Sequence, residues 1–435
     1  MMKRIFFVLS CCCIVFFASC SDDDHFSADQ SLMLTFPSDT IRMDTVFSRV
    51  PSSTRSFWVH NYSSDGIRIS EVLLERGGES GFRVNVDGSY LSNVITDLEV
   101  RKGDSLMVFV ELTASENGSV EPQHVTDNLV FRLESGRVQH VCLSAYSWDA
   151  LTMHDVTVSS DTAICSVQPI IVYGTLTIAE GATLSLQNTS LFFHDGAGME
   201  INGTLHADSC LFRGDRLDRM FSYLPYDRVS GQWRGLHFAC GSRNNILTRC
   251  EIRNPSDGIL CDSTSQLQMH DVVVHNCQGV GLKAVNASVS LSYCRLSNTM
   301  GDCLIAEGGE MDINRCTLAQ FFPLIGSTQV AFRFSNKADL VLLCDSTLMT
   351  GYAEDVIFGN EVDTLHSYEY YFADCILRTS AVYDTLRFQR VIWEKPADTV
   401  QGTKHFRLVD INNMRYDFRL DSISPAYQLG IGRAE

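Results

Sequence analysis

Apolar and polar residues alternate in short runs through the first third of the chain. Residues 56–60 and 106–112 place apolar side chains at every second position, and residues 66–74 do so at Ile67 and Ile69. Such alternation is typical of strands that have one face on a core and the other in water. Two further alternating runs flank Gly136 and predict a hairpin. About seven strands within residues 31–148 predict an immunoglobulin-like β-sandwich.

From residue 149 onward the pattern becomes a repeat of a small or polar residue, an alternating apolar strand and a turn. Units begin at the following positions: Asn188, Cys210, Cys250, Asp271, Cys294 and Cys316. The intervals are 22, 40, 21, 23 and 22 residues, and the interval of 40 is one unit plus an insertion. This period fits one coil of a right-handed parallel β-helix, in which successive coils pair about 4.8 Å apart. The chain is therefore expected to be all-β, with a sandwich over 31–148 and a right-handed parallel β-helix over 149–435.

Cysteines recur at one position of this repeat. The following cysteines share that position: Cys210, Cys250, Cys294, Cys316 and Cys375. Asp271 interrupts the series. Stacked coils would place these side chains in one inward-facing column, where a thiol packs as a small hydrophobe. The cysteines after Cys20 are therefore predicted to be mostly free and buried, although disulfides are the usual expectation for an exported protein.

Neither the cysteines nor the histidines have the spacing of a metal site. The body of the chain contains no CxxC pair, which structural zinc sites commonly use. Five histidines are expected at turns or on the surface rather than as ligands: His154, His194, His237, His270 and His275. No metal and no other cofactor is predicted.

The repeat also predicts how the coils turn and how the solenoid ends. Asn188, Asn254, Asn276 and Asn298 stand where strands must turn a corner, and asparagine tolerates the left-handed backbone conformation. The segment that begins at Tyr416 resembles the closing element of secreted β-helix proteins, and the resemblance implies that it seals the last coil.

The first thirty residues predict export and a lipid anchor. Two basic residues precede an apolar run over 5–17, which is too short for a bilayer of about 30 Å and fits a secretory signal peptide over 1–19. The sequence that ends at Cys20 resembles a bacterial lipobox, which implies lipidation of Cys20; the alternative is an ordinary signal peptide that is rich in cysteine. The three aspartates that follow are expected in a disordered tether over 20–30. This tether resembles the acidic segment that directs Bacteroidetes lipoproteins to the outer face of the outer membrane; the alternative is a merely solvated linker.

Length and charge narrow the class of partner. A chain of 435 residues is too long for one compact core, which agrees with two domains. The formal net charge of −18 argues against nucleic acid and against an anionic membrane surface as partners. The expected membrane contact is the lipid anchor alone.

Two lines of sequence extend these expectations to a family. The insertion ends in the line QWRGLHF over 232–238, which matches the pattern QWxGIxF except for Leu236 in place of isoleucine, and the line GDCLIAEGG follows over 301–309. Together with the repeats, they resemble a family of Bacteroidetes surface lipoproteins that join an Ig-like module to a right-handed β-helix. The resemblance implies an exported outer-membrane lipoprotein, exposed at the surface, and it brings no established activity.

The insertion also gathers the residues that are the candidates for ligand binding. Its charged and aromatic residues are Arg213, Asp215, Arg216, Asp218, Tyr223, Tyr226, Asp227, Arg228 and Trp233. In a loop on the solenoid, such aromatic rings would stack on sugars and the charges would bind hydroxyl or carboxylate groups. The alternative is an ordered loop whose rings pack on the coil and whose charges are solvated.

The function expected from the sequence is a non-catalytic envelope lipoprotein that presents a rigid β-helix surface to a polysaccharide or an envelope protein. The alternative is a polysaccharide lyase or glycoside hydrolase. Four acidic residues at turns could form a catalytic pair only if the coils stacked them: Asp195, Asp208, Asp257 and Asp262. No residue is assigned a catalytic role.

Overall fold

The computed structural model describes residues 25–323, 329–395 and 402–433. The chain divides into two compact units, and the second is built mainly from Ser147–Glu435. The predicted signal peptide, the lipidation site Cys20 and the acidic run lie outside the described residues. Within the described residues, no helix is long and apolar enough to cross a membrane.

The first unit is a sandwich of two sheets. The five-stranded sheet has the order β1 (Thr40–Phe47), β9 (Val138–Trp148), β8 (Gln123–Leu133), β3 (Ile67–Leu74) and β6 (Val94–Val100). The four-stranded sheet has the order β2 (Arg55–His60), β7 (Ser105–Leu112), β4 (Phe82–Val86) and β5 (Ser89–Tyr90).

The alternation of apolar residues in this unit has the expected cause. Val59, Ile69, Val108 and Phe131 are completely buried, whereas their neighbours along each strand point to solvent. Strands β8 and β9 are neighbours in the sheet, and Gly136 between them has a φ of 83°, which confirms the predicted hairpin. The two-sheet, antiparallel arrangement is the predicted one; the immunoglobulin-like assignment stays a prediction.

The tether expected over 20–30 is wrong in its C-terminal half. Phe26 forms a β-bridge with Gly66, and the guanidinium of Arg68 lies 4.9 Å from the centre of the Phe26 ring. Leu32 and Leu34 are buried in the same unit. The apolar ring at residue 26 therefore attaches the chain to the sandwich five residues before the predicted start of the sandwich at residue 31.

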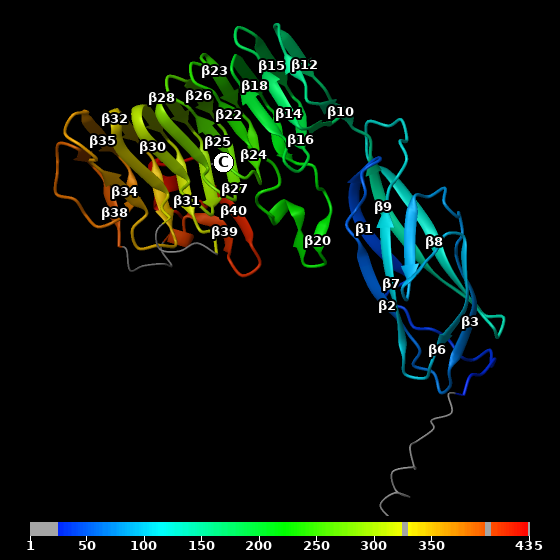
Figure 1. Cartoon of the computed structure of the whole chain (residues 1–435). Helices are drawn as coiled ribbons and strands as arrows, with labels where there is room; N and C mark the ends of the chain where they lie inside the picture. Colours follow the sequence, from blue (N-terminus) through cyan, green and yellow to red (C-terminus); the bar gives the residue numbers. More distant parts are fainter. Residues whose placement is uncertain (1–24, 324–328, 396–401, 434–435) are drawn as a thin grey trace, which may run out of the picture. The chain divides into compact units, whose positions relative to one another are not determined.

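The second unit is a parallel β-helix, seen in Figure 1 as a stack of strands that runs from green to orange. One column of strands forms an 11-stranded sheet: β10 (Leu151–His154), β13 (Ile170–Tyr173), β16 (Ser190–Phe193), β19 (Leu211–Gly214), β24 (Glu251–Arg253), β27 (Val273–Cys277), β29 (Arg295–Thr299), β31 (Thr317–Gln320), β33 (Leu348–Gly351), β36 (Ile376–Arg378) and β38 (Ile392–Glu394). We call it the first sheet.

A 16-stranded sheet supplies the other two sides of each coil, and we call it the second sheet. One side consists of β11 (Thr157–Val158), β14 (Thr175–Ile178), β17 (Gly198–Ile201), β22 (Leu236–Phe238), β25 (Ile259–Cys261) and β34 (Ile357–Asn360). The other side consists of β12 (Thr162–Cys165), β15 (Thr183–Gln187), β18 (Thr204–Asp208), β23 (Asn245–Thr248), β26 (Gln266–His270), β35 (Tyr368–Ala373) and β37 (Phe388–Gln389). Three long strands continue through both sides: β28 (Leu282–Ser292), β30 (Leu304–Asn314) and β32 (Phe332–Asp345).

The register of the first sheet locates the cysteine column and corrects one member. The pairings of β24, β27 and β29 place Cys250, Val272 and Cys294 at one level, so Val272 and not Asp271 occupies the column. Thr347 takes the same place between Cys316 and Cys375. Asp271 lies one position earlier.

That earlier position is the corner of every coil. Residues there have positive φ, for example 51° at Arg249, 56° at Asp271 and 54° at Tyr293. The corner turns the chain sharply into the first sheet and keeps the side chain that follows inside. The four predicted asparagine corners are also left-handed, with φ of 49° at Asn188, 61° at Asn254, 59° at Asn276 and 49° at Asn298.

The cysteine column is buried, as predicted, and its members form no disulfide within the described chain. Its five cysteines are at most 3% exposed, and all twelve cysteines of the described chain are free thiols. Burial raises the pKa of two further interior thiols, Cys261 and Cys303, to about 12. Buried thiols of this kind stay protonated and pack as small apolar groups.

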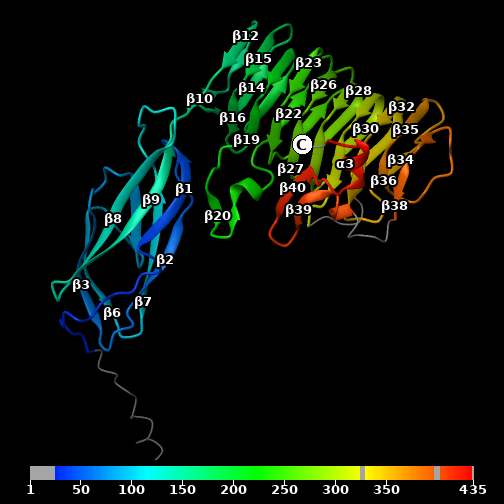
Figure 2. The same ribbon diagram turned by 180° about the vertical axis from the view of Figure 1, so that it is seen from behind.

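The C-terminal segment does not seal the last coil, which corrects the expectation from its resemblance. Its elements are β39 (Phe406–Asp410), β40 (Arg415–Leu420) and the short helix α3 (Pro425–Leu429), and they fold back along the outer surface of the first sheet (Figure 2). Phe406 and Phe418 enclose Phe321 in a second apolar core that is separate from the interior of the solenoid. The apolar residues of this segment therefore pack against the side of the β-helix instead of closing its end.

Candidate functional site

The insertion between β19 and β22 lies against the outer surface of the first sheet. It contains a small hairpin of β20 (Arg219–Phe221) and β21 (Leu224–Pro225), followed by the single-turn helix η1 (Tyr226–Arg228). Asp227 in η1 lies 3.1 Å from the Nη1 atom of Arg213 on β19 and 3.2 Å from that of Arg253 on β24. These contacts fix η1 across two neighbouring coils.

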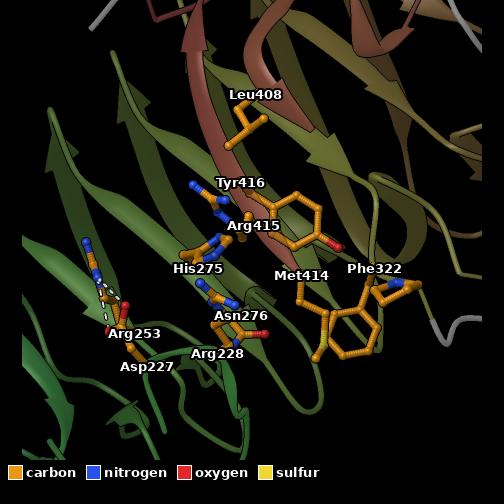
Figure 3. A pocket seen from close by; sticks show the side chains of 11 residues that line it. Asp227, Arg228, Arg253, His275, Asn276, Phe322, Leu408, Met414, Arg415 and Tyr416 are labelled. Carbon is orange, nitrogen blue, oxygen red and sulfur yellow. Dashed lines mark hydrogen bonds and ion pairs between the residues drawn. The ribbon is translucent and has the colours of Figure 1, made fainter. Parts of the chain in front are cut away.

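The insertion meets the C-terminal hairpin over this sheet, and a pocket lies between them. The Nη1 atom of Arg228 donates a hydrogen bond of 3.1 Å to the carbonyl oxygen of Asn413, which stands in the turn between β39 and β40. The pocket has a volume of about 310 Å³. Figure 3 shows its side chains; the lining residues are Asp227, Arg228, Arg253, His275, Asn276, Phe322, Pro323, Leu408, Met414, Arg415 and Tyr416.

The floor of the pocket comes from the repeat itself. The register places Arg253 on β24 directly beside His275 on β27, with both side chains on the outer surface of the first sheet. Asn276 follows at the corner and donates a hydrogen bond of 2.8 Å to the side-chain oxygen of Asn254 one coil earlier. The floor is thus held by the same stacking that builds the solenoid.

His275 is half-buried on the outer surface of the first sheet, and it stands within strand β27 and not at a turn. Burial, with further contributions from Arg253 and Arg295, lowers the pKa of His275 to about 3. Its Nδ1 atom lies 3.0 Å from the hydroxyl of Ser297, and its ring packs edge-on against Tyr416 and Phe418. At neutral pH the imidazole therefore adds an uncharged polar surface to the pocket.

The charged side chains of the pocket differ in whether they form ion pairs with one another. Asp227 is held between Arg213 and Arg253, and Arg253 also reaches Glu251 at 2.7 Å. Arg228 and Arg415, in contrast, form no ion pair with any carboxylate of the described chain. Positive charge therefore exceeds negative charge in the lining.

Most of the nine residues expected to bind ligand serve the fold of the insertion. Asp227 and Arg228 line the pocket, and Arg213 supports Asp227. Arg216 pairs with the buried Asp218 at 2.7 Å and covers the ring of Tyr226 at 4.7 Å. These contacts make the insertion an ordered wall, as the packing alternative described.

None of the three aromatic residues expected to stack on sugars, Tyr223, Tyr226 and Trp233, is in the pocket lining. Trp233 is 1% exposed, stacks on Phe193 with ring centres 4.3 Å apart and donates a hydrogen bond to the carbonyl of Arg253. Its assignment as a ligand-binding residue is wrong, because the indole fills the core where the insertion rejoins the coil. Tyr223 is exposed and stacks on Phe221, away from the pocket lining.

Asp215 takes part in a separate pair. Its carboxylate is buried and lies 2.7 Å from the Nδ1 atom of His194, whose side chain is half exposed. Burial raises the pKa of Asp215 despite the opposing hydrogen bond from His194. The pair stands at the edge of the first sheet, beside the ring of Tyr173.

A second charged group lies on the second sheet. His237 on β22 contacts Glu200 through Nδ1 at 2.8 Å and Asp262 through Nε2 at 3.0 Å. Burial alone would lower the pKa of His237, but the two hydrogen bonds outweigh it and raise the pKa. Over the part of the chain that the structure describes, no group of three histidine, cysteine or acidic side chains could hold a metal ion.

Sequence reasoning missed the residues that complete the pocket. Arg253 and His275 occupy the position of Arg213 in the next two repeats, so the register alone could have extended the candidate set to them. Met414, Arg415 and Tyr416 carry no such signal, because they belong to a segment outside the repeat. Only the folded chain brings them to the insertion.

A model for the right-handed β-helix region matches residues 165–318. The solenoid is a right-handed parallel β-helix. This match covers the coils on both sides of the insertion, and it describes a fold rather than an activity. No curated protein matches the chain.

Two solved structures of glycoside hydrolases resemble the chain weakly. The family 123 glycoside hydrolase from Clostridium perfringens is 7% identical, with a TM-score of 0.20, over 31% of this chain and 30% of its own. The catalytic unit of the GH87 α-1,3-glucanase from Streptomyces thermodiastaticus is 11% identical, with a TM-score of 0.27, over 77% of this chain and 75% of its own. Likeness at this level carries no argument about activity.

Proposed function

We propose that the protein is an exported outer-membrane lipoprotein, anchored through Cys20, which binds a glycan without cleaving it. The binding site is the pocket between the insertion and the C-terminal hairpin. The β-helix acts as a rigid scaffold that positions this pocket.

One observation carries the proposal. The two longest departures from the repeat are 185 residues apart at Arg228 and Asn413, yet they meet on the same side of the same sheet. A solenoid needs neither departure for its own stacking, because each coil is stabilised by its neighbours. Loops that a rigid scaffold holds around one pocket are the usual form of a binding site.

The lining has the chemistry of saccharide recognition. Tyr416 and Phe322 offer aromatic surface, and Asn276 and the arginines offer hydrogen bonds in fixed directions. Pockets of about 300 Å³ lie at the lower end of the range for small ligands, which favours a short stretch of a glycan. Aromatic surface with a few directed polar groups suits a sugar ring, whose faces are apolar and whose edges carry hydroxyl groups.

The lining favours binding over hydrolysis. Most glycosidases place two carboxyl groups on either side of the scissile bond. Among the described residues of the pocket, Asp227 is the sole carboxylate, and two arginines already hold it. An acid bound in this way is a poor proton donor, because both ion pairs stabilise its charged form.

The proposal is tested with the mature full-length chain in a nonionic detergent, on a glycan array and in polysaccharide depolymerisation assays. The expected result is saturable binding to a set of glycans with no release of reducing or unsaturated ends. Tyr416→Ala should weaken this binding about tenfold or more, since it removes the ring from the pocket. Tyr383→Ala is the matched control, because Tyr383 is 96% exposed and outside the pocket. Absence of binding to any glycan, or depolymerisation of any polymer, would overturn the proposal.

The anchor has its own test. Cys20→Ala should abolish incorporation of labelled palmitate and release the protein from the membrane fraction, because one cysteine carries the whole attachment. Cys13→Ala, in the leader, should leave both properties unchanged. Labelling that survives in the Cys20→Ala variant would contradict the anchor.

A polysaccharide-active enzyme is the second candidate, and the pair of His194 and Asp215 favours it. A buried carboxylate that orients a half-exposed imidazole is an arrangement used for general base catalysis. If the chain depolymerises a polysaccharide, His194→Gln should abolish the activity while His206→Gln, on the second sheet, retains it. A depolymerising activity that His194→Gln leaves intact would remove this assignment.

A further inference from the structure

We infer that the pocket selects saccharides that carry a carboxylate or a sulfate group. This inference rests on the proposed function and adds the charge of the ligand to it. The chain has a formal net charge of −18, so an anionic ligand requires a local site of the opposite sign. The pocket is such a site.

Arg228 and Arg415 are the groups that would hold the anion. Arg228 uses one of its N–H groups on the carbonyl oxygen of Asn413. Asp410 stands opposite Arg415 in the β39–β40 pair, but its carboxylate accepts hydrogen bonds from the backbone and side chain of Asn413. A guanidinium has five N–H donors, so both residues keep donors for a ligand.

The remaining charges of the lining do not oppose an anion. The lining contains one carboxylate, Asp227, and three arginines, which are Arg228, Arg253 and Arg415. Its formal charge is therefore +2, since His275 is neutral. The charge of Asp227 is already balanced by Arg213 and Arg253. Glu251, the further partner of Arg253, is outside the lining.

The placement of the guanidinium groups of Arg228 and Arg415 fits a sugar acid better than an isolated anion. Arg228 comes from the insertion and Arg415 from the C-terminal hairpin, so they stand on the two walls of the pocket (Figure 3). Tyr416, beside Arg415, supplies ring surface, and Asn276 supplies an amide at the floor. Guanidinium groups bind carboxylate and sulfate oxygens through paired hydrogen bonds, which also orient the sugar that carries them.

Matched pairs of ligands separate charge from sugar identity. Titration calorimetry on the mature full-length chain would compare oligogalacturonate with its methyl ester, and chondroitin sulfate fragments with unsulfated chondroitin. The first pair tests the carboxylate and the second tests the sulfate. In at least one pair, the form with the additional charge should bind about tenfold or more tightly, and its affinity should fall as salt is added from 0.05 to 0.3 M, since that affinity depends on exposed charges.

Matched variants assign the effect to the pocket. Arg228→Gln and Arg415→Gln should each weaken the charged ligand about tenfold, while Arg243→Gln, at an exposed arginine on another side of the solenoid, should change nothing. Arg415→Lys should retain part of the affinity, because it keeps the charge but loses the paired geometry. Thermal melting of each variant identifies loss of folding.

The outcomes distinguish the inference from the proposed function. Equal binding of the charged and uncharged members of both pairs would overturn the inference and leave glycan binding standing. Preference for the charged form that both glutamine variants retain would also overturn it, because the charge would then act elsewhere. Binding of no glycan at all would remove the proposed function and the inference together.

Discussion

The two sheets of the β-helix differ in what covers their outer surfaces, and the difference is visible residue by residue. In the second sheet, β26 alternates between exposed and buried positions, as expected of a sheet with one face in water. In the first sheet, β31, β33 and β36 are buried at every position, because the C-terminal segment packs on their outer face. The strands of the first sheet therefore lose their alternation where another segment of the chain covers their outer face.

The largest loss of stability is expected from a substitution of Glu394, which lies beneath the C-terminal segment. Its carboxylate is buried and accepts hydrogen bonds from His405 at 2.7 Å and from Thr350 at 2.8 Å. Glu394→Ala leaves both partners buried without an acceptor, and we expect a loss of about 3–5 kcal/mol in the free energy of unfolding, measured by urea denaturation. Glu369→Ala, at an exposed acid on β35, should cost less than about 0.5 kcal/mol. Equal effects of the two substitutions would show that the covering segment adds nothing.

A smaller loss of stability is expected when a cysteine inside a coil is replaced, in comparison with a cysteine on the outside. Cys294 is completely buried in the thiol column, whereas Cys240 is exposed. Cys294→Ser buries a hydroxyl in a space that suits a thiol and should lower the free energy of unfolding by about 1–3 kcal/mol. Cys240→Ser should leave stability unchanged. A tolerated serine at residue 294 would contradict the apolar role of the column.

The smallest effect is expected on the open second sheet, at His237. A neutral imidazole has one N–H, so contacts with both Glu200 and Asp262 favour the protonated ring, whose pKa is raised in the folded state. The resulting stability is fully present below the unfolded pKa of about 6.5 and is lost as pH rises through the higher folded pKa.

Melting temperatures at pH 5.5 and pH 8.5 test this sign. Wild type should melt at a higher temperature than His237→Gln at pH 5.5, and the difference should shrink at pH 8.5. Because the side chain of His237 is 35% exposed, solvent screening keeps the difference in stability below about 1 kcal/mol. His206→Gln, on the same sheet and without a carboxylate partner, supplies the control. A margin that grows with pH would contradict the arrangement.

The repeat made much of this fold predictable. Because coils stack in register, the spacing of Cys210, Cys250 and Cys294 was enough to predict an inward column and the coil length. Two unit starts, Asn188 and Asp271, were corner residues counted instead of the residue that follows each of them. A period read from the sequence gives the length of a coil, but it locates the residues that share a level only to within one position.

The pocket was predictable only in part, for a physical reason. Asp227 and Arg228 stood out as charges in an insertion, and both line the pocket. Trp233 stood out for the same reason but fills the core, since a local pattern does not say which side of the coil a ring will choose. Arg415 and Tyr416 reach the pocket through contacts between distant segments, which leave no periodic trace in the sequence.

The fold-back of the C-terminal segment has a consequence for when the pocket comes into being. Neighbouring coils make contacts about 22 residues apart, so the solenoid can grow coil by coil as the chain emerges. The C-terminal segment instead joins Arg433 to Asp271 and Arg315 to Gly430, across more than a hundred residues. The second wall of the pocket thus arrives last, so the pocket is complete only after the C-terminal segment has docked on the solenoid.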